Sequence, residues 1–193
     1  MTAKLHLVGE PEADQLLSDN PFALLVGMLL DQQIPMEVAF DGPHKLAERL
    51  GEVTPRLIAE TDVEEFVTVC ATPPAVHRFP ASMGRRVHDL AAAVVRDYDG
   101  DAEALWTDGE PDGREVLKRL KALPGFGDQK ARIFLALLGK QRSLEAPGWQ
   151  QAAGDYGRHG ARMSIADVVD EESMTQVRVW KREQKAAAKA AKG

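Results

Sequence analysis

Residues 114–142, REVLKRLKALPGFGDQKARIFLALLGKQR, hold the pattern that decides the fold. Leucines recur at every third position from Leu117 to Leu123, with lysine and arginine between them, which predicts a short amphipathic helix. Pro124-Gly125 ends that helix, and Asp128 is expected to cap the next one. The stretch therefore predicts two helices joined by a tight, glycine-rich turn.

The turn itself has the features of an anion site. Gly125 and Gly127 allow backbone conformations closed to residues with a side chain, so peptide N–H groups can lie directly against a ligand. The N-terminus of the second helix adds unpaired N–H groups and the positive end of the helix dipole. A phosphate group is the natural ligand of such a turn.

The same stretch is a basic island in an acidic chain. Its eight lysines and arginines face only Glu115 and Asp128, so its net charge is +6. The whole chain has a net charge of −6, which leaves −12 for the remaining residues. Such an asymmetry indicates a nucleic acid as the partner.

The segment LPGFGDQKA, residues 123–131, and the apolar IFLALL after it resemble a known hairpin. It is the hairpin of helix-hairpin-helix DNA glycosylases of the endonuclease III superfamily, the HhH-GPD group, named for this motif, a Gly/Pro-rich loop and a catalytic aspartate. Residues 20–40, NPFALLVGMLLDQQIPMEVAF, also resemble the first helix and the glutamine-containing turn of that superfamily. The resemblance covers residues 20–142 and implies an all-α, two-lobed helical bundle with a lesion pocket between the lobes.

The resemblance also implies one folded unit over residues 1–193, with the N-terminal part and the part after the hairpin sharing one lobe. The helical pattern agrees, because caps followed by a first-turn proline, such as Asn20-Pro21 and Thr54-Pro55, recur along the chain. Residues 5–8 are the only strand-like fragment. Residues 183–193 have the composition of a flexible basic tail.

The activity implied by the resemblance is that of a base-excision repair DNA glycosylase. Such an enzyme binds damaged double-stranded DNA, flips a base out of the helix and hydrolyses its N-glycosidic bond. An alternative is a relative that has lost the reaction and keeps only DNA or lesion recognition. The residues expected to contact DNA are Leu123, Pro124, Gly125, Phe126, Gly127, Gln129 and Lys130.

Lysine chemistry is not expected. Relatives that also cut the sugar–phosphate chain carry a nucleophilic lysine two positions after the second hairpin glycine. That position is Gln129, and an amide cannot form a Schiff base, so the resemblance implies a monofunctional enzyme. Lys130 is one residue further along a helix, so it is expected to face elsewhere and to contact phosphate.

The catalytic aspartate of the group has no counterpart at the expected place. The matching turn reads APGWQ at residues 146–150, which puts Trp149 where the carboxylate should be. Trp149 could stack on a nucleobase or plug the pocket. Glu145, Asp155 and Asp31 are alternative carboxylates, and the sequence does not choose among them. Without a positioned carboxylate, cleavage remains possible for a cationic, already weakened base.

A wedge residue is also expected. Enzymes that flip a base often fill the resulting hole in the duplex with a side chain, and the glutamine-bearing turn of relatives lies near that hole. Gln32 and Gln33 are therefore the predicted wedge residues.

Composition limits the remaining possibilities. Cys70 is the only cysteine, which excludes the four-cysteine iron–sulfur cluster of several relatives, and no metal or other cofactor is expected. No apolar run approaches the ~20 residues that cross a bilayer. The first residues lack the apolar core of a secretory signal, so we expect a cytoplasmic protein, and a monomer.

Overall fold

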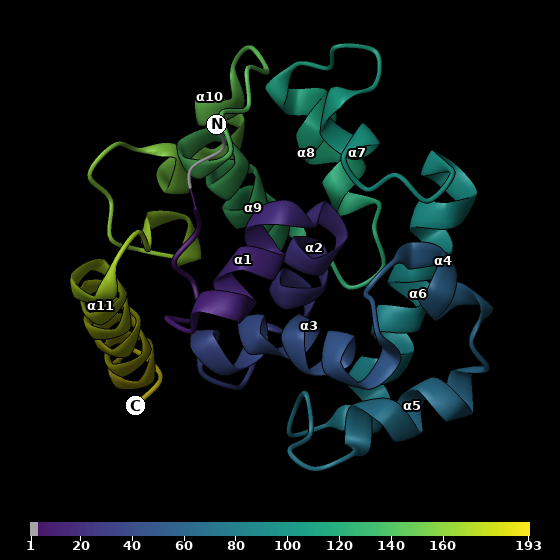
Figure 1. Cartoon of the computed structure of the whole chain (residues 1–193). Coiled ribbons are helices and arrows are strands. Elements are labelled where there is room, and N and C mark those ends of the chain that lie inside the picture. The colour runs from purple at the N-terminus through teal and green to yellow at the C-terminus, as the bar shows by residue number, and fades with distance from the viewer. Residues whose placement is uncertain (1–3) are drawn as a thin grey trace.

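The structure is a computed structural model that describes residues 4–193; residues 1–3, part of the segment assessed for a secretory signal, lie outside them. Helices account for all the regular structure, and residues 4–193 contain no strand, which confirms the all-α prediction (Figure 1). The α-helices are α1 (Pro11–Asp19), α2 (Pro21–Leu30), α3 (Met36–Leu50), α4 (Pro55–Glu60), α5 (Val63–Ala71), α6 (Pro80–Tyr98), α7 (Ala104–Thr107), α8 (Gly113–Lys121), α9 (Asp128–Gln141), α10 (Trp149–Ala153) and α11 (Glu171–Ala190). Two short 3-10 helices are η1 (Gly154–Gly157) and η2 (Ile165–Asp167).

Local sequence signals set several helix starts. Asn20 caps α2 by accepting a hydrogen bond from the Ala23 N–H at 3.0 Å, and Pro21 occupies the first turn. Thr54 caps α4 and Asp62 caps α5 in the same way. These side chains satisfy N–H groups that have no partner inside the helix, which fixes where each helix begins.

Residues 5–8 are extended but belong to no strand. Leu5 and Leu7 are buried in the core, and their N–H groups donate to side chains of α1. The Leu5 N–H donates to the hydroxyl of Ser18 at 2.9 Å, and the Leu7 N–H donates to the carboxylate of Asp14 at 2.8 Å. The alternating apolar pattern therefore reflects the burial of Leu5 and Leu7. Side chains of α1 accept the backbone hydrogen bonds that a neighbouring strand would otherwise accept.

Helix α2 lies at the centre of the molecule. Nine of its ten residues, from Phe22 to Leu30, are buried. Gly27 lets α3 approach closely, because a Cβ there would lie 2.5 Å from the ring of Phe40. Helices α4, α5 and α6 gather on one side of α2, and α8, α9 and α10 on the other (Figure 1). Buried side chains of both groups form one continuous core.

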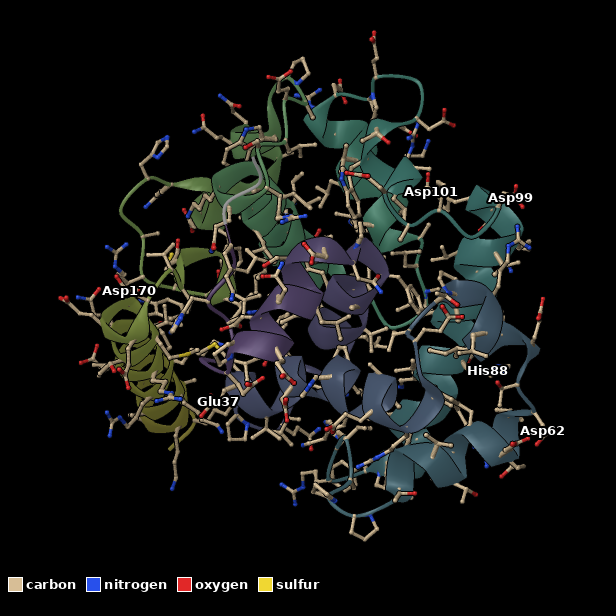
Figure 2. All side chains as sticks on the ribbon, in the orientation of Figure 1. Glu37, Asp62, His88, Asp99, Asp101 and Asp170 are labelled. Carbon is tan, nitrogen blue, oxygen red and sulfur yellow. The ribbon has the colours of Figure 1, made fainter. Side chains whose placement is uncertain are left out.

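Helix α11 differs from the sequence prediction. It begins after Asp170, whose carboxylate accepts the Ser173 N–H, and it continues to Ala190. Residues 183–190, predicted as a flexible tail, therefore form its last turns, and the high helix propensity of alanine and lysine explains this continuation. Figure 2 shows Glu37 of α3 beside this helix, where its carboxylate pairs with Arg178 at 2.5 Å.

Candidate functional site

The hairpin between α8 and α9 rests on α2. Gly125 has φ +79°, which residues with a side chain rarely adopt, and a Cβ there would lie 2.2 Å from Leu29 Cδ1. Both conformation and packing therefore require this glycine. Gly127 differs from the prediction, because its φ is −78° and a Cβ would meet nothing within 4 Å. The fold gives no reason of its own for glycine at position 127.

Two of the residues predicted to contact DNA have side chains in the core. Leu123 and Phe126 are buried, and the ring of Phe126 packs edge-on against Phe134 of α9. Both side chains belong to the hydrophobic core, so they support the hairpin from inside. Gly127 and Gln129 are exposed, and Pro124 is half-buried.

The start of α9 carries no side-chain cap. Gly127 is the N-cap residue, and Asp128, which was expected to be the cap, is the first residue of the helix. The Asp128 carboxylate instead pairs with Lys121 at 3.0 Å and with Arg132 at 2.7 Å. These two cations lower the pKa of Asp128, with Arg132 the larger cause. The N–H groups at the start of α9 are thus left for an external acceptor, with one carboxylate beside them.

Part of the positive charge of residues 114–142 serves the fold. Lys140 is nearly buried and pairs with Asp167 at 2.6 Å. Arg119 of α8 donates to the carbonyl of Asp108 at 2.9 Å. Fewer cations of this stretch are therefore available to bind a ligand than its net charge of +6 suggests.

A pocket of about 790 Å³ opens beside the start of α9. Its walls come from the end of α2, the first turns of α9, the segment around η1, and the second half of α11. Its apolar lining includes Met28, Ile133, Met163 and Trp180. Its polar lining includes Asp31, Gln129, Lys130, Tyr156, Lys181 and Lys185.

Asp31 is the one carboxylate that lines this pocket. Its side chain is 10% exposed, and Lys181 Nζ lies 3.8 Å from its Oδ2. Burial raises the pKa of Asp31 above its ordinary value of 3.8, while Lys181 and then Lys130 act in the opposite direction. Asp31 is therefore the only one of the three sequence candidates that the fold places in the pocket.

Lys130 also lies in the pocket, contrary to the expectation that it faces away toward phosphate. Its ammonium donates to the carbonyl oxygen of Leu29 at 2.8 Å and to Gln32 Oε1 at 3.3 Å. The long side chain reaches back to the end of α2, where carbonyl groups lack partners inside the helix. Burial lowers the pKa of Lys130 to about 8, opposed by the charge of Asp31.

The two glutamines of the predicted wedge face different surroundings. Gln32 is half-buried, and its side chain accepts from Lys130 and donates to Met83 Sδ at 3.5 Å. Gln33 is exposed, has φ +59° and lines the pocket. Of the two glutamines, only Gln33 is exposed.

His77 holds this turn in place from the loop before α6. It is 2% exposed, and its Nδ1 accepts the Phe79 N–H at 3.0 Å. Its Nε2 must therefore carry the hydrogen in the neutral ring, and it donates to the carbonyl oxygen of Gln32 at 2.8 Å. The buried imidazole thus fixes the backbone from which Gln33 projects.

The turn at residues 146–150 lies at the other end of α9. Trp149 is half-buried there, and a Cβ on Gly139 would lie 2.4 Å from its ring. Trp149 therefore packs against α9 and is not among the residues that line the pocket beside the start of that helix. Glu145 is exposed near the same turn, and Asp155 is exposed and pairs with Arg158 at 2.7 Å.

Several residues that line the pocket were not predicted from the sequence, among them Tyr156, Trp180, Lys181 and Lys185. Tyr156 accepts a hydrogen bond from Gln129 Nε2 at 2.9 Å, and Trp180 and Lys181 come from α11. A signal did exist, because residues 180, 181, 184, 185 and 188 share one face of a helix. A helix face alone does not show what it packs against, so this pattern could not place these residues beside Asp31 and Lys130.

A model of HhH-GPD superfamily base excision DNA repair proteins matches residues 26–192. The chain belongs to the HhH-GPD superfamily. The match extends well past the hairpin and includes the whole of α11, so every wall of the pocket lies within it. Comparison with curated proteins and with solved structures found no significant match.

HhH-GPD membership makes this a DNA-binding protein of the base-excision repair superfamily, as the resemblance implied. None of the helices in residues 4–193 combines the length and apolar character needed to cross a bilayer. The iron–sulfur cluster of several relatives does not fit this chain, because Cys70 is its only cysteine. Cys70 is buried against Gly84 of α6, and burial raises its pKa to about 12.

Proposed function

We propose that this HhH-GPD protein is a monofunctional DNA glycosylase that hydrolyses the N-glycosidic bond of a damaged base flipped out of double-stranded DNA. The observation that carries the proposal is the buried carboxylate of Asp31, which lies with Lys130 and Lys181 in a pocket beside the hairpin. Perturbed ionisable groups in a cleft are the usual sign of a reactive site.

The hairpin would hold the DNA backbone beside this pocket. The uncapped N–H groups after Gly127 are suited to a phosphate oxygen, and the absence of a side chain at Gly127 permits close approach. Gln33 projects from the adjoining turn and would fill the space left by the flipped base. The damaged base would then enter the pocket between α2, α9 and α11.

The chemistry assigned to the pocket needs one anion and at least one cation. As the base leaves with the bonding electrons, the sugar becomes cationic, and the Asp31 carboxylate stabilises that charge. A water molecule adds to C1′ of the sugar and gives up a proton, with Asp31 as the general base. The ammonium groups of Lys130 and Lys181 stabilise the charge that develops on the departing base, and a proton then restores the neutral base. We propose that this hydrolysis needs no metal or other cofactor.

A lyase that uses Lys130 as a nucleophile is the second candidate. The lowered pKa of Lys130, about 8, favours it, because a larger share of the amine is unprotonated than in a free lysine. Against it, attack on the sugar would break the hydrogen bonds to Leu29 and Gln32. Borohydride reduction during the reaction separates the two candidates, since only a Schiff base is trapped as a stable protein–DNA adduct.

The experiment that tests the proposal is single-turnover incubation with duplexes that each carry one damaged base. The wild-type protein should release at least one base without forming an adduct with borohydride. Asp31→Asn should slow that release by about 10²–10⁴-fold. Glu145→Gln and Asp155→Asn are matched controls and should leave it unchanged.

Two results would overturn the assignment. Undiminished release by Asp31→Asn would remove Asp31 from the reaction. Tight binding of damaged duplexes with no release from any of them would indicate a recognition protein that has lost the reaction.

A further inference from the structure

The pocket that contains Asp31 has an excess of positive charge. Lys130, Lys181 and Lys185 line it, against the single carboxylate. Lys130 and Lys181 are both close enough to Asp31 to influence its ionisation, and Lys181 Nζ is 3.8 Å from its Oδ2. A flipped base that carries a positive charge would therefore enter beside ammonium groups that repel it.

The polar groups of the pocket are mainly hydrogen-bond donors. Lys130 has three N–H donors, two of which are used by Leu29 and Gln32. The Tyr156 hydroxyl accepts from Gln129 at 2.9 Å, which leaves its own hydrogen free to donate. The ligand best matched to this set presents several acceptor oxygens along its edge.

The apolar part of the pocket can hold a flat ring. Trp180 is half-buried on α11 and stands next to Lys181 in sequence, while Ile133 of α9 and Met163 complete the apolar lining. An aromatic face stacks on any nucleobase, so this wall supports binding without choosing the base. Selection must come from the charged and donor groups.

We propose that this pocket selects neutral, carbonyl-rich bases, such as uracil and oxidised bases, and rejects cationic N-alkylated purines. The inference rests on the proposed glycosylase function. A neutral base leaves with negative charge spread over its ring nitrogen and carbonyl oxygens, which an ammonium group stabilises. A cationic alkylpurine leaves as a neutral molecule, so the same ammonium groups oppose its binding and do not assist its departure. The sequence pointed to the opposite class of substrate, because a missing catalytic aspartate leaves cleavage possible for a cationic base.

The test compares two sets of duplexes under single-turnover conditions. One set carries uracil, thymine glycol or 8-oxoguanine, and the other carries 7-methylguanine or 3-methyladenine. We expect release only from the first set. Lys181→Gln should slow that release by about tenfold or more, because it removes an ammonium group from the pocket. Lys189→Gln makes the same charge change on α11 outside the pocket lining and is the matched control.

Lys181→Arg is the control for a loss of activity caused by misfolding and not by the loss of charge. It keeps the positive charge and should retain most of the release, while thermal melting reports whether each variant folds. Release from the alkylated set alone would overturn the substrate class and leave the glycosylase intact. Equal slowing by Lys181→Gln and Lys189→Gln would overturn the role of the pocket lysine. No release from either set would instead contradict the proposed function itself.

Discussion

The two ends of helix α9 differ in what surrounds them. At the first end, Lys130 and Asp31 line an open pocket that α11 completes. At the last end, the ring of Trp149 packs on Gly139. The helix has 14 residues, so its ends are about 20 Å apart at ~1.5 Å per residue. A side chain at one end cannot serve chemistry at the other.

Position along the chain is therefore a poor guide to position in the site. Counting past the hairpin leads to Trp149, where the resemblance expects a carboxylate. The structure uses that turn for packing and brings Asp31, a residue that precedes the hairpin, to the pocket. Four experiments test whether the two ends of α9 differ in this way.

The largest expected effect comes from removing the Trp149 ring at the last end of α9. Trp149→Ala should lower the free energy of unfolding by about 2–3 kcal/mol, because it leaves a cavity against α9. At a temperature where the variant is folded, its rate of base release should stay close to that of the wild type. A folded variant that has lost base release would show that the two ends are not separate.

Variants of the two hairpin glycines should distinguish a loss of core packing from a loss of DNA contact. Gly125→Ala should reduce the free energy of unfolding by about 1–3 kcal/mol, because its added methyl group meets Leu29. Gly127→Ala should change stability by less than about 0.5 kcal/mol, since its surroundings are open. It should nevertheless weaken binding to damaged and undamaged duplexes alike, as measured by fluorescence anisotropy. Unchanged affinity would mean that no phosphate lies on Gly127.

The rate of base release should depend on pH through Lys130 and Asp31, which line the pocket at the start of α9. The Lys130 ammonium is present below its pKa of about 8 and is lost above it. Release that needs the ammonium should therefore fall by up to about tenfold between pH 7 and pH 9. On the acid side, release should fall at a pH above 3.8, because the pKa of Asp31 is raised. Lys130→Arg should remove the alkaline fall, whereas a nucleophilic amine would make the rate rise through pH 8.

The smallest expected effect is on general DNA affinity. Asp128 places a carboxylate at the uncapped start of α9, where it opposes a phosphate and pairs with Lys121 and Arg132. Asp128→Asn should strengthen binding to every duplex by about threefold to tenfold at low salt. Asp155→Asn removes an exposed carboxylate from a pair outside the hairpin and serves as the control. Equal affinities for the two variants would place the DNA elsewhere.

Much of the fold could be predicted because its signals are local. The caps at Asn20 and Thr54 and the turn at Gly125 depend on a few neighbouring residues, and all are present. The pocket could not be predicted in the same way. Asp31 and Lys181 are far apart in sequence and meet only because α11 docks on the body, which involves Arg178 and Glu37.

The orientation of Lys130 shows the same limit on a smaller scale. On a helix, the side chains of consecutive residues leave the axis about 100° apart, so Lys130 starts in a different direction from Gln129. The long side chain bends back to the end of α2, because unpaired carbonyl groups and the Gln32 side chain are there to accept its hydrogen bonds. Such a contact depends on another helix, which no local pattern describes.

The most direct test of the central claim is the structure of the protein bound to a duplex that carries a non-hydrolysable uracil nucleotide. We expect the uracil to lie in the pocket between Asp31 and Trp180, with Gln33 in the space that the base left and a phosphate beside Gly127. A flipped base near Trp149 and Glu145, or a uracil still stacked in the duplex, would contradict this expectation.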